Sequence, residues 1–304
     1  MITLLIRKTL TVLLSLFLLF SSHILCPSYI DAQEESLVIG LLPEMNVFKQ
    51  KQRFDPLAAY LTERMEIEVN LTILSRYGNI IERIKEEKID GAFLGSFTGA
   101  LAISQLGVEP LARPINMDGT STYYGHIFVK KNSNIKTVAD MKGKTLALVE
   151  RATTAGYIFP LAWFKRQGVD DINTYFSDHF FTGSHDGAID AVLNNKADIG
   201  AAKNTIYERM RESYPRIAEE LVILTSSPRV PSNGLCVREN LSEQHKVKLK
   251  DLLLNLHQDK EGNVVLKKLG AKRFVETSSE DYQPVLDLAE EAGIEMKKYD
   301  YYNP

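Results

Sequence analysis

The chain is short of the residue types that several common classes of protein require. Of its 304 residues only two are cysteines, Cys26 and Cys236, which excludes a disulfide-rich scaffold and a zinc site with four thiolates. The formal net charge is −3, so the chain lacks the basic surplus of a sequence-independent nucleic-acid binder. With 18 glycines and 11 prolines it is neither collagen-like nor low-complexity. This length and composition suit a soluble protein with two compact lobes.

Long apolar runs are also scarce, and the one that occurs lies near the start. Residues 9–20 are apolar, follow two basic residues, and precede a polar stretch that ends in Ala32. This order is typical of a secretory signal peptide over residues 1–32, and the run is too short to span a bilayer comfortably. Lipidation at Cys26 is the alternative, although Leu25 stands where a small residue is preferred. We expect cleavage after Ala32, export to the periplasm and no disulfide in the mature chain.

The remaining chain contains one pattern of short apolar strands and amphipathic helices twice. In the first copy we expect strands at 37–42, 67–74 and 89–94, with helices opening at Asp55-Pro56 and covering 78–88. In the second copy we expect strands at 145–149 and 197–201, with helices at 157–167 and 186–195. Alternating strands and helices predict parallel sheets with helices on their faces.

The two copies share one particular spacing. Two apolar residues, a lysine and an aspartate recur 108 residues apart, as Ile81, Ile84, Lys88 and Asp90 and then as Ile189, Val192, Lys196 and Asp198. The chain crosses between the copies at 123–129 and returns after 221–224. We therefore expect an α/β fold of the type II periplasmic-binding-protein kind, with a two-strand hinge and a ligand cleft between two lobes. Lobe 1 would comprise 33–122 and 232–304, and lobe 2 would comprise 123–231.

Motifs of the common catalytic classes are missing. There is no Gly-x-Ser-x-Gly, no His-Glu-x-x-His and no Cys-x-x-Cys, and the histidines are not at metal-ligand spacing. The segment Gly143-Lys144-Thr145 resembles the end of a phosphate loop, but Val138 stands where that loop needs its first glycine. We predict no enzymatic activity, no metal and no cofactor.

One segment has the chemistry of an oxyanion site. Thr153 and Thr154 lie between the strand at 145–149 and the helix that follows, where free backbone N–H groups and the helix dipole favour an anion. Two neighbouring hydroxyls would add donors. A plain helix cap is the alternative interpretation of the same two residues.

Four segments together resemble the periplasmic phosphonate-binding proteins of ABC importers, within the wider group that binds phosphate, phosphite and phosphonate. The resemblance covers about residues 37–277. It rests on four segments, Arg76–Glu82, Tyr123–Val129, Thr153–Tyr157 and Gly183–Asp186. Their order and spacing also match those of the family.

The resemblance implies a set of ligand-binding residues. In the family, the hydroxyl-rich loop and its backbone amides hold the phosphonate oxygens, which here assigns Thr153, Thr154 and Ala155. Tyr77 and Tyr123 would donate phenolic hydroxyls, and His185 an imidazole N–H. Ser96, which follows the strand at 89–94, is expected at the mouth of the cleft. Several neutral donors converging on one point suit a tetrahedral oxyanion.

Two departures from the family pattern bear on the ligand. The third hydroxyl of the loop is replaced by Ala155. Members that take aminoalkyl phosphonates use two carboxylates, and these positions correspond to Thr205 or Ile206 and to Asn233, none of them acidic. Lys203 nearby would repel an ammonium. We expect phosphite, phosphate or a small alkylphosphonate to bind more tightly than 2-aminoethylphosphonate, unless an acid such as Glu44 or Asp118 reaches the tail.

The resemblance therefore predicts a monomeric receptor that delivers a small phosphorus oxyanion to an ABC permease in the inner membrane and binds no nucleic acid. The alternative hypothesis keeps the fold but makes the chain a ligand-sensing input for a membrane histidine kinase. Neighbouring genes for a permease and an ATPase, or for a kinase, would separate the two.

Overall fold

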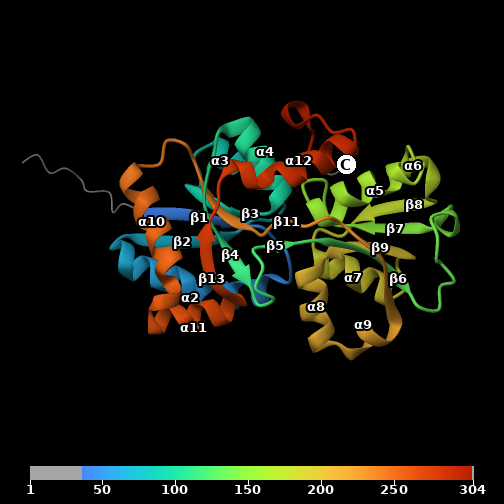
Figure 1. Cartoon of the computed structure of the whole chain (residues 1–304), viewed down its shortest axis with the longest axis horizontal. Helices are drawn as coiled ribbons and strands as arrows, with labels where there is room; N and C mark the ends of the chain where they lie inside the picture. The colour runs from blue at the N-terminus through green and yellow to red at the C-terminus, as the bar shows by residue number, and fades with distance from the viewer. Residues whose placement is uncertain (1–35, 303–304) are drawn as a thin grey trace, which may run out of the picture. The chain divides into compact units, whose positions relative to one another are not determined.

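Two mixed β-sheets organise the chain in the computed structural model, which describes residues 36–302 (Figure 1). The predicted signal peptide at 1–32 lies outside these residues. The first sheet has the order β13 (Ala271–Glu276), β4 (Glu109–Asn116), β12 (Gly234–Val237), β3 (Gly91–Leu94), β1 (Ser36–Leu41), β2 (Glu68–Ile73). The second has the order β10 (Leu221–Ser226), β6 (Gly125–Lys130), β9 (Ile199–Lys203), β7 (Thr145–Leu148), β8 (Asp178–Phe181).

Parallel pairs form the core of each sheet, as the sequence predicts, although β8 is not among the strands expected from the sequence. β1 pairs in parallel with β2 and β3, and β7 pairs in parallel with β8 and β9. Antiparallel strands that the sequence analysis did not assign extend the first sheet, namely β4 and β13. Both sheets belong to one compact unit of the chain.

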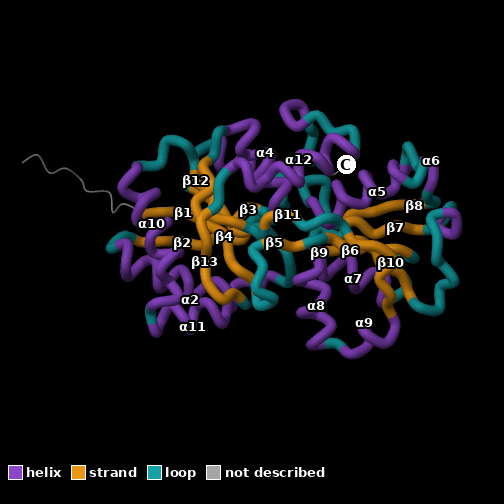
Figure 2. Tube along the Cα trace, viewed as in Figure 1, coloured by secondary structure: helices purple, strands orange, loops and turns teal. Residues whose placement is uncertain are grey.

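Helices cover both faces of each sheet (Figure 2). On the first sheet, one face packs against α2 (Val47–Met65), α10 (Glu243–Asn255) and α11 (Lys260–Leu269), and the other against α3 (Asn79–Lys85), α4 (Ser96–Leu106) and α12 (Gln283–Glu291). On the second sheet, α7 (His185–Leu193), α8 (Asn204–Ser213) and α9 (Pro215–Glu220) lie on one face, and α5 (Phe159–Arg166) and α6 (Ile172–Tyr175) on the other. Burial of these apolar faces is the main source of stability.

The repeated aspartates perform the same structural task in each sheet. The Asp90 carboxylate accepts the backbone N–H of Val38 at 2.8 Å, and the Asp198 carboxylate accepts that of Thr145 at 2.9 Å. Each aspartate thereby fixes the start of the central parallel strand beside it. The common spacing in the sequence reflects this common contact.

The first crossing segment is divided into two strands. β5 (Thr122–Tyr123) pairs with β11 (Val230–Pro231) in a separate two-stranded sheet, whereas β6 continues into the second sheet. Asn204 causes the division, because its side chain accepts the N–H of Tyr124 and its own N–H donates to the Tyr124 carbonyl. The two crossing segments thus run side by side as the predicted two-strand hinge.

The predicted start of the first helix at Asp55-Pro56 is wrong. α2 begins at Val47, because the side chain of Asn46 accepts the N–H groups of Phe48 and Lys49 and caps the helix there. Pro56 consequently lies inside the helix, where it lacks one backbone donor. The eight additional residues place Gln50 and Arg53 on the helix.

Candidate functional site

Three hydroxyl groups from separate parts of the chain meet at the predicted oxyanion site. Ser96 is the first residue of α4 after β3, Thr154 follows β7, and Tyr123 ends β5. The Ser96 Oγ atom lies 2.7 Å from the Tyr123 hydroxyl and 2.6 Å from the Thr154 Oγ1 atom. All three side chains are buried. The carboxyl ends of strands from both sheets therefore converge here, as expected for a ligand site in an α/β fold.

This hydroxyl cluster, formed by Ser96, Tyr123 and Thr154, contains donors without strong acceptors. Within residues 36–302, none of the three hydroxyls donates to a carbonyl or carboxylate; their side-chain partners are the other hydroxyls of the cluster, and the Tyr123 hydroxyl also accepts the backbone N–H of Ser96. Buried hydroxyls usually find stronger acceptors. The cluster is thus suited to surround an acceptor that the chain does not itself supply.

Tyr77 and His185 add two more donors. The Tyr77 hydroxyl is buried and has no hydrogen-bond partner among the described residues, and its ring packs edge-on against His185 at a centroid distance of 6.2 Å. The His185 Nδ1 atom accepts the backbone N–H of Lys203 at 3.2 Å, which assigns the ring proton to Nε2. Burial lowers the pKa of His185 to about 4, so the ring is a neutral donor at pH 7.

The structure separates the roles of the two predicted threonines. The Thr153 hydroxyl donates to the backbone carbonyl of Glu150 at 2.6 Å and therefore does not join the hydroxyl cluster. Ala155 is buried, and its methyl group packs against Gly125, where an added Cβ would lie 3.0 Å away. The loop contributes one side-chain donor, from Thr154, rather than two.

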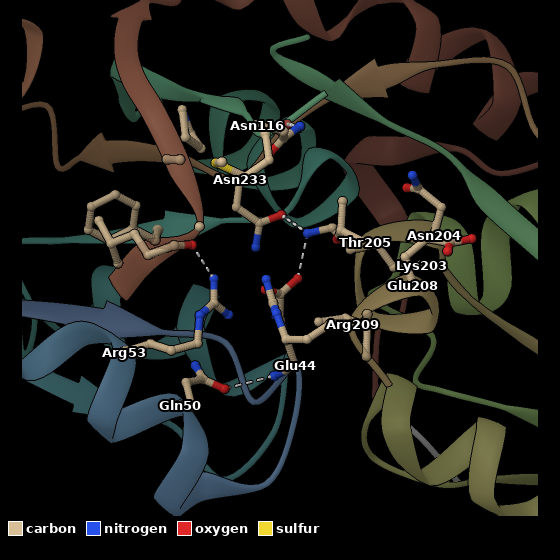
Figure 3. Close-up of a pocket in the computed structure, with 18 of the residues that line it drawn as sticks. Glu44, Gln50, Arg53, Asn116, Lys203, Asn204, Thr205, Glu208, Arg209 and Asn233 are labelled. Atoms are coloured by element: carbon tan, nitrogen blue, oxygen red, sulfur yellow. Dashed lines mark hydrogen bonds and ion pairs between the residues drawn. The ribbon is translucent and has the colours of Figure 1, made fainter. Parts of the chain in front are cut away.

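A buried cation, the ammonium of Lys203, lies over the Tyr123 ring of the hydroxyl cluster, and Figure 3 shows it with Glu44 and Asn233. The Lys203 ammonium donates to Glu44 at 2.7 Å and to Asn233 at 2.8 Å, and it stands 4.4 Å from the centroid of the Tyr123 ring. Burial alone would raise the pKa of Glu44, but the charge of Lys203 lowers it to about 2. Glu44 and Lys203 therefore form an ionised pair with little access to solvent.

A cavity of about 450 Å³ opens on the other side of this ion pair. Lys203, Glu44 and Asn233 form part of its wall, while Arg53 from α2 and Arg209 from α8 enter it from two further directions (Figure 3). None of the predicted site residues lines it. The ion pair thus stands between the cavity and the hydroxyl cluster.

Glu44 and Lys203 are not among the site residues predicted from the sequence. Both lie at the carboxyl end of a strand, as Ser96 and Thr154 do, since Glu44 comes just after β1 and Lys203 ends β9. The two arginines had no such signal, because they sit within helices far apart in the sequence.

Glu150 connects the segment after β7, which carries Thr154, to the segment before α3, which carries Tyr77. Its carboxylate accepts the backbone N–H of Tyr77 at 3.0 Å, although Glu150 follows β7 and Tyr77 precedes α3. Burial raises the pKa of Glu150 to about 7, and the hydrogen bond to Tyr77 only partly opposes this. Near neutral pH the carboxyl group is therefore poised between its two forms.

Two kinds of feature are absent from residues 36–302. No cluster of three potential metal-binding side chains is present there. No helix in that range has the length and apolar character needed to cross a membrane.

Two sheets whose strand ends converge on one site, joined by a two-stranded hinge, define a type II periplasmic binding protein. A solved structure of this class, a methylphosphonate complex of a protein from Prochlorococcus marinus, superimposes with a TM-score of 0.77. The match is 20% identical and covers 86% of this chain and 99% of that chain. It establishes the fold.

The chain belongs to the family of periplasmic phosphonate substrate-binding proteins of ABC transporters, whose sequence model matches residues 39–282. A phosphonates-binding periplasmic protein of Escherichia coli K12 is 24% identical over 284 residues, covering 91% of this chain and 83% of the relative. A probable phosphite-binding protein of an ABC transporter from Prochlorococcus marinus is 23% identical, and the match covers 93% of this chain and 95% of the relative. The chain is thus a substrate-binding component of the ABC phosphonate importer type.

Replacement of Glu150 by glutamine should flatten the pH dependence of stability between about pH 4.5 and 7. The folded protein holds this proton more tightly than the unfolded chain, so the stabilisation is complete below pH 4.5 and is lost as the pH rises through about 7. The amide oxygen of the glutamine would still accept the Tyr77 N–H, and above pH 8 the variant should be more stable by on the order of 3 kcal/mol.

Urea denaturation at pH 5 and pH 8 would measure this effect. The exposed carboxylate Glu219 provides the control variant, Glu219→Gln. An equal fall in stability between the two pH values for wild type and Glu150→Gln would contradict the prediction.

Proposed function

We propose that this protein is a periplasmic receptor for phosphite, phosphate and small phosphonates without a cationic substituent, and that it passes them to an ABC permease in the inner membrane. In this proposal residues 1–32 are the signal peptide, and the mature chain is a monomer that binds its ligand without chemical change. The segments 33–122 and 232–304 form one lobe and 123–231 the other.

The unpartnered Tyr77 hydroxyl is the observation that carries the proposal. It is buried within the same apolar cluster as Tyr123 and has no acceptor among the described residues, while the neighbouring hydroxyls of Ser96 and Thr154 have only each other and Tyr123. A buried donor without an acceptor costs about 1–3 kcal/mol. A tetrahedral oxyanion would give these donors a charged acceptor and recover that free energy.

Lys203 supports the exclusion of amino compounds. Its ammonium already occupies the position between Glu44 and Asn233, the acid and amide that a ligand ammonium would need. A second ammonium there would meet a like charge and find no free carboxylate. Burying an unpaired cation costs several kcal/mol, which corresponds to a loss of affinity of about 100-fold or more.

Thr154→Val should weaken binding of methylphosphonate and phosphite by roughly 10-fold to 100-fold, because it removes one hydrogen bond to a charged acceptor. The neighbouring Thr153→Val is the matched control. It should reduce the free energy of unfolding by about 0.5–1.5 kcal/mol, because the Glu150 carbonyl loses one of its two donors and keeps the Thr153 backbone N–H at 3.0 Å, while affinity changes little. Calorimetry on both variants checks this; equal losses of affinity would remove the distinction between the two hydroxyls.

Lys203→Met should shift the preference of the protein toward 2-aminoethylphosphonate, because it leaves the Glu44 carboxylate without its partner. Breaking a buried pair costs about 3–5 kcal/mol, and the ligand ammonium should restore part of this. We expect 2-aminoethylphosphonate to raise the melting temperature of the variant more than that of wild type, which a thermal-shift panel would measure.

The double variant Glu44→Gln/Lys203→Met is the control, because it removes both charges. 2-Aminoethylphosphonate should raise its melting temperature no more than that of wild type. If wild type already binds 2-aminoethylphosphonate more tightly than methylphosphonate, phosphite and phosphate, the assignment of Lys203 is wrong.

A further inference from the structure

The cavity beyond the Lys203–Glu44 pair has a chemistry that the hydroxyl cluster does not explain. Its volume of about 450 Å³ exceeds what the compact oxyanions of the proposed function need, and the hydroxyls of the cluster lie outside it. Lys203 touches both spaces, since its ammonium borders the cavity and stands over the Tyr123 ring. A substituent on a ligand held by the hydroxyl cluster would therefore have to pass Lys203 and Glu44 to enter this cavity.

Two arginines face the cavity from different elements. Arg53 extends from α2 and donates to the Leu269 carbonyl at 2.7 Å, and Arg209 extends from α8 (Figure 3). The Arg209 Nη1 atom is buried and has no hydrogen-bond partner in the part of the chain that the structure describes. No carboxylate of residues 36–302 forms an ion pair with either guanidinium. Both cations thus retain donors for an anion.

The acidic side chains around the cavity form no ion pair with these arginines in residues 36–302, although the charges of Glu44 and Glu212 attract Arg209 from a greater distance. Three of the four carboxylates face other cations, in the pairs Glu44–Lys203 at 2.7 Å, Glu208–Arg211 at 2.7 Å and Asp118–Arg229 at 3.8 Å. The fourth, Glu212, is exposed at the surface. Burial and the charge of Arg209 together lower the pKa of Arg53 to about 10, so the two guanidinium groups repel one another across the cavity.

We propose that Arg53 and Arg209 form a second anion subsite, which holds a negatively charged group on the substituent of a phosphonate. The substrate class is a phosphonate with a carboxylate or a second phosphate on its tail. Guanidinium groups suit both anions, because their planar donors match the two oxygens of a carboxylate or phosphate. This proposal rests on the proposed function, which places the first phosphorus group at the hydroxyl cluster.

A series of carboxyalkylphosphonates with one to three methylene groups tests the subsite by calorimetry on the mature protein. Each is compared with the alkylphosphonate of the same size without the carboxylate. We expect at least one member to bind 10-fold or more tightly than its uncharged counterpart. Arg209→Gln and Arg53→Gln should each bring this ratio of affinities close to one. Arg211→Gln, on the same helix as Arg209 and ion-paired with Glu208, should keep the ratio of wild type.

Three results would overturn the inference. If no carboxyalkylphosphonate of the series binds wild type more tightly than its uncharged counterpart, the subsite is excluded without the need for any variant. A ratio in Arg209→Gln equal to that of wild type excludes the assigned arginine. Binding of methylphosphonate or phosphite in either case leaves the proposed function standing, whereas no binding of any phosphorus compound in the panel overturns both proposals.

Discussion

The buried ion pair between Glu44 and Lys203 ties the ends of the two sheets together. Glu44 follows β1, the middle one of the three parallel strands of the first sheet, and Lys203 ends β9 of the second. Charges so deeply buried are tolerated only when they are paired and hydrogen-bonded, and here Asn233 and the face of Tyr123 complete the surroundings of the ammonium. The geometry of the site depends on this contact, because it positions Tyr123 and separates the hydroxyl cluster from the cavity.

The hydroxyl cluster has the opposite electrostatic character. Its donors are neutral, and they have few acceptors of their own in the residues described. Neutral donors can surround an oxyanion without the desolvation cost of additional buried charges. The Lys203 charge nearby adds attraction for an anion while repelling a cation. In the proposed function, different residues of one site therefore select the ligand by its charge and by its hydrogen bonds.

Much of this arrangement could be predicted from local patterns. The parallel strands, the two crossing segments and the repeated aspartates all have short-range signatures, because strand alternation, helix periodicity and turn residues are local properties. The same rule for strand ends located Ser96 and Thr154. The start of α2 was missed because the Asn46 cap decided it, while the proline at position 56 suggested a later start.

The sequence by itself determined the class of fold, the family and the hydroxyl-bearing residues, because these depend on patterns within short segments. Only the tertiary structure decided which hydroxyls meet, that Thr153 turns toward Glu150, and that Lys203 occupies the space between Glu44 and Asn233. Arg53 and Arg209 are 156 positions apart and share no local pattern. They face one cavity because helices α2 and α8, which follow strands of different sheets, are brought together by the packing of the whole chain.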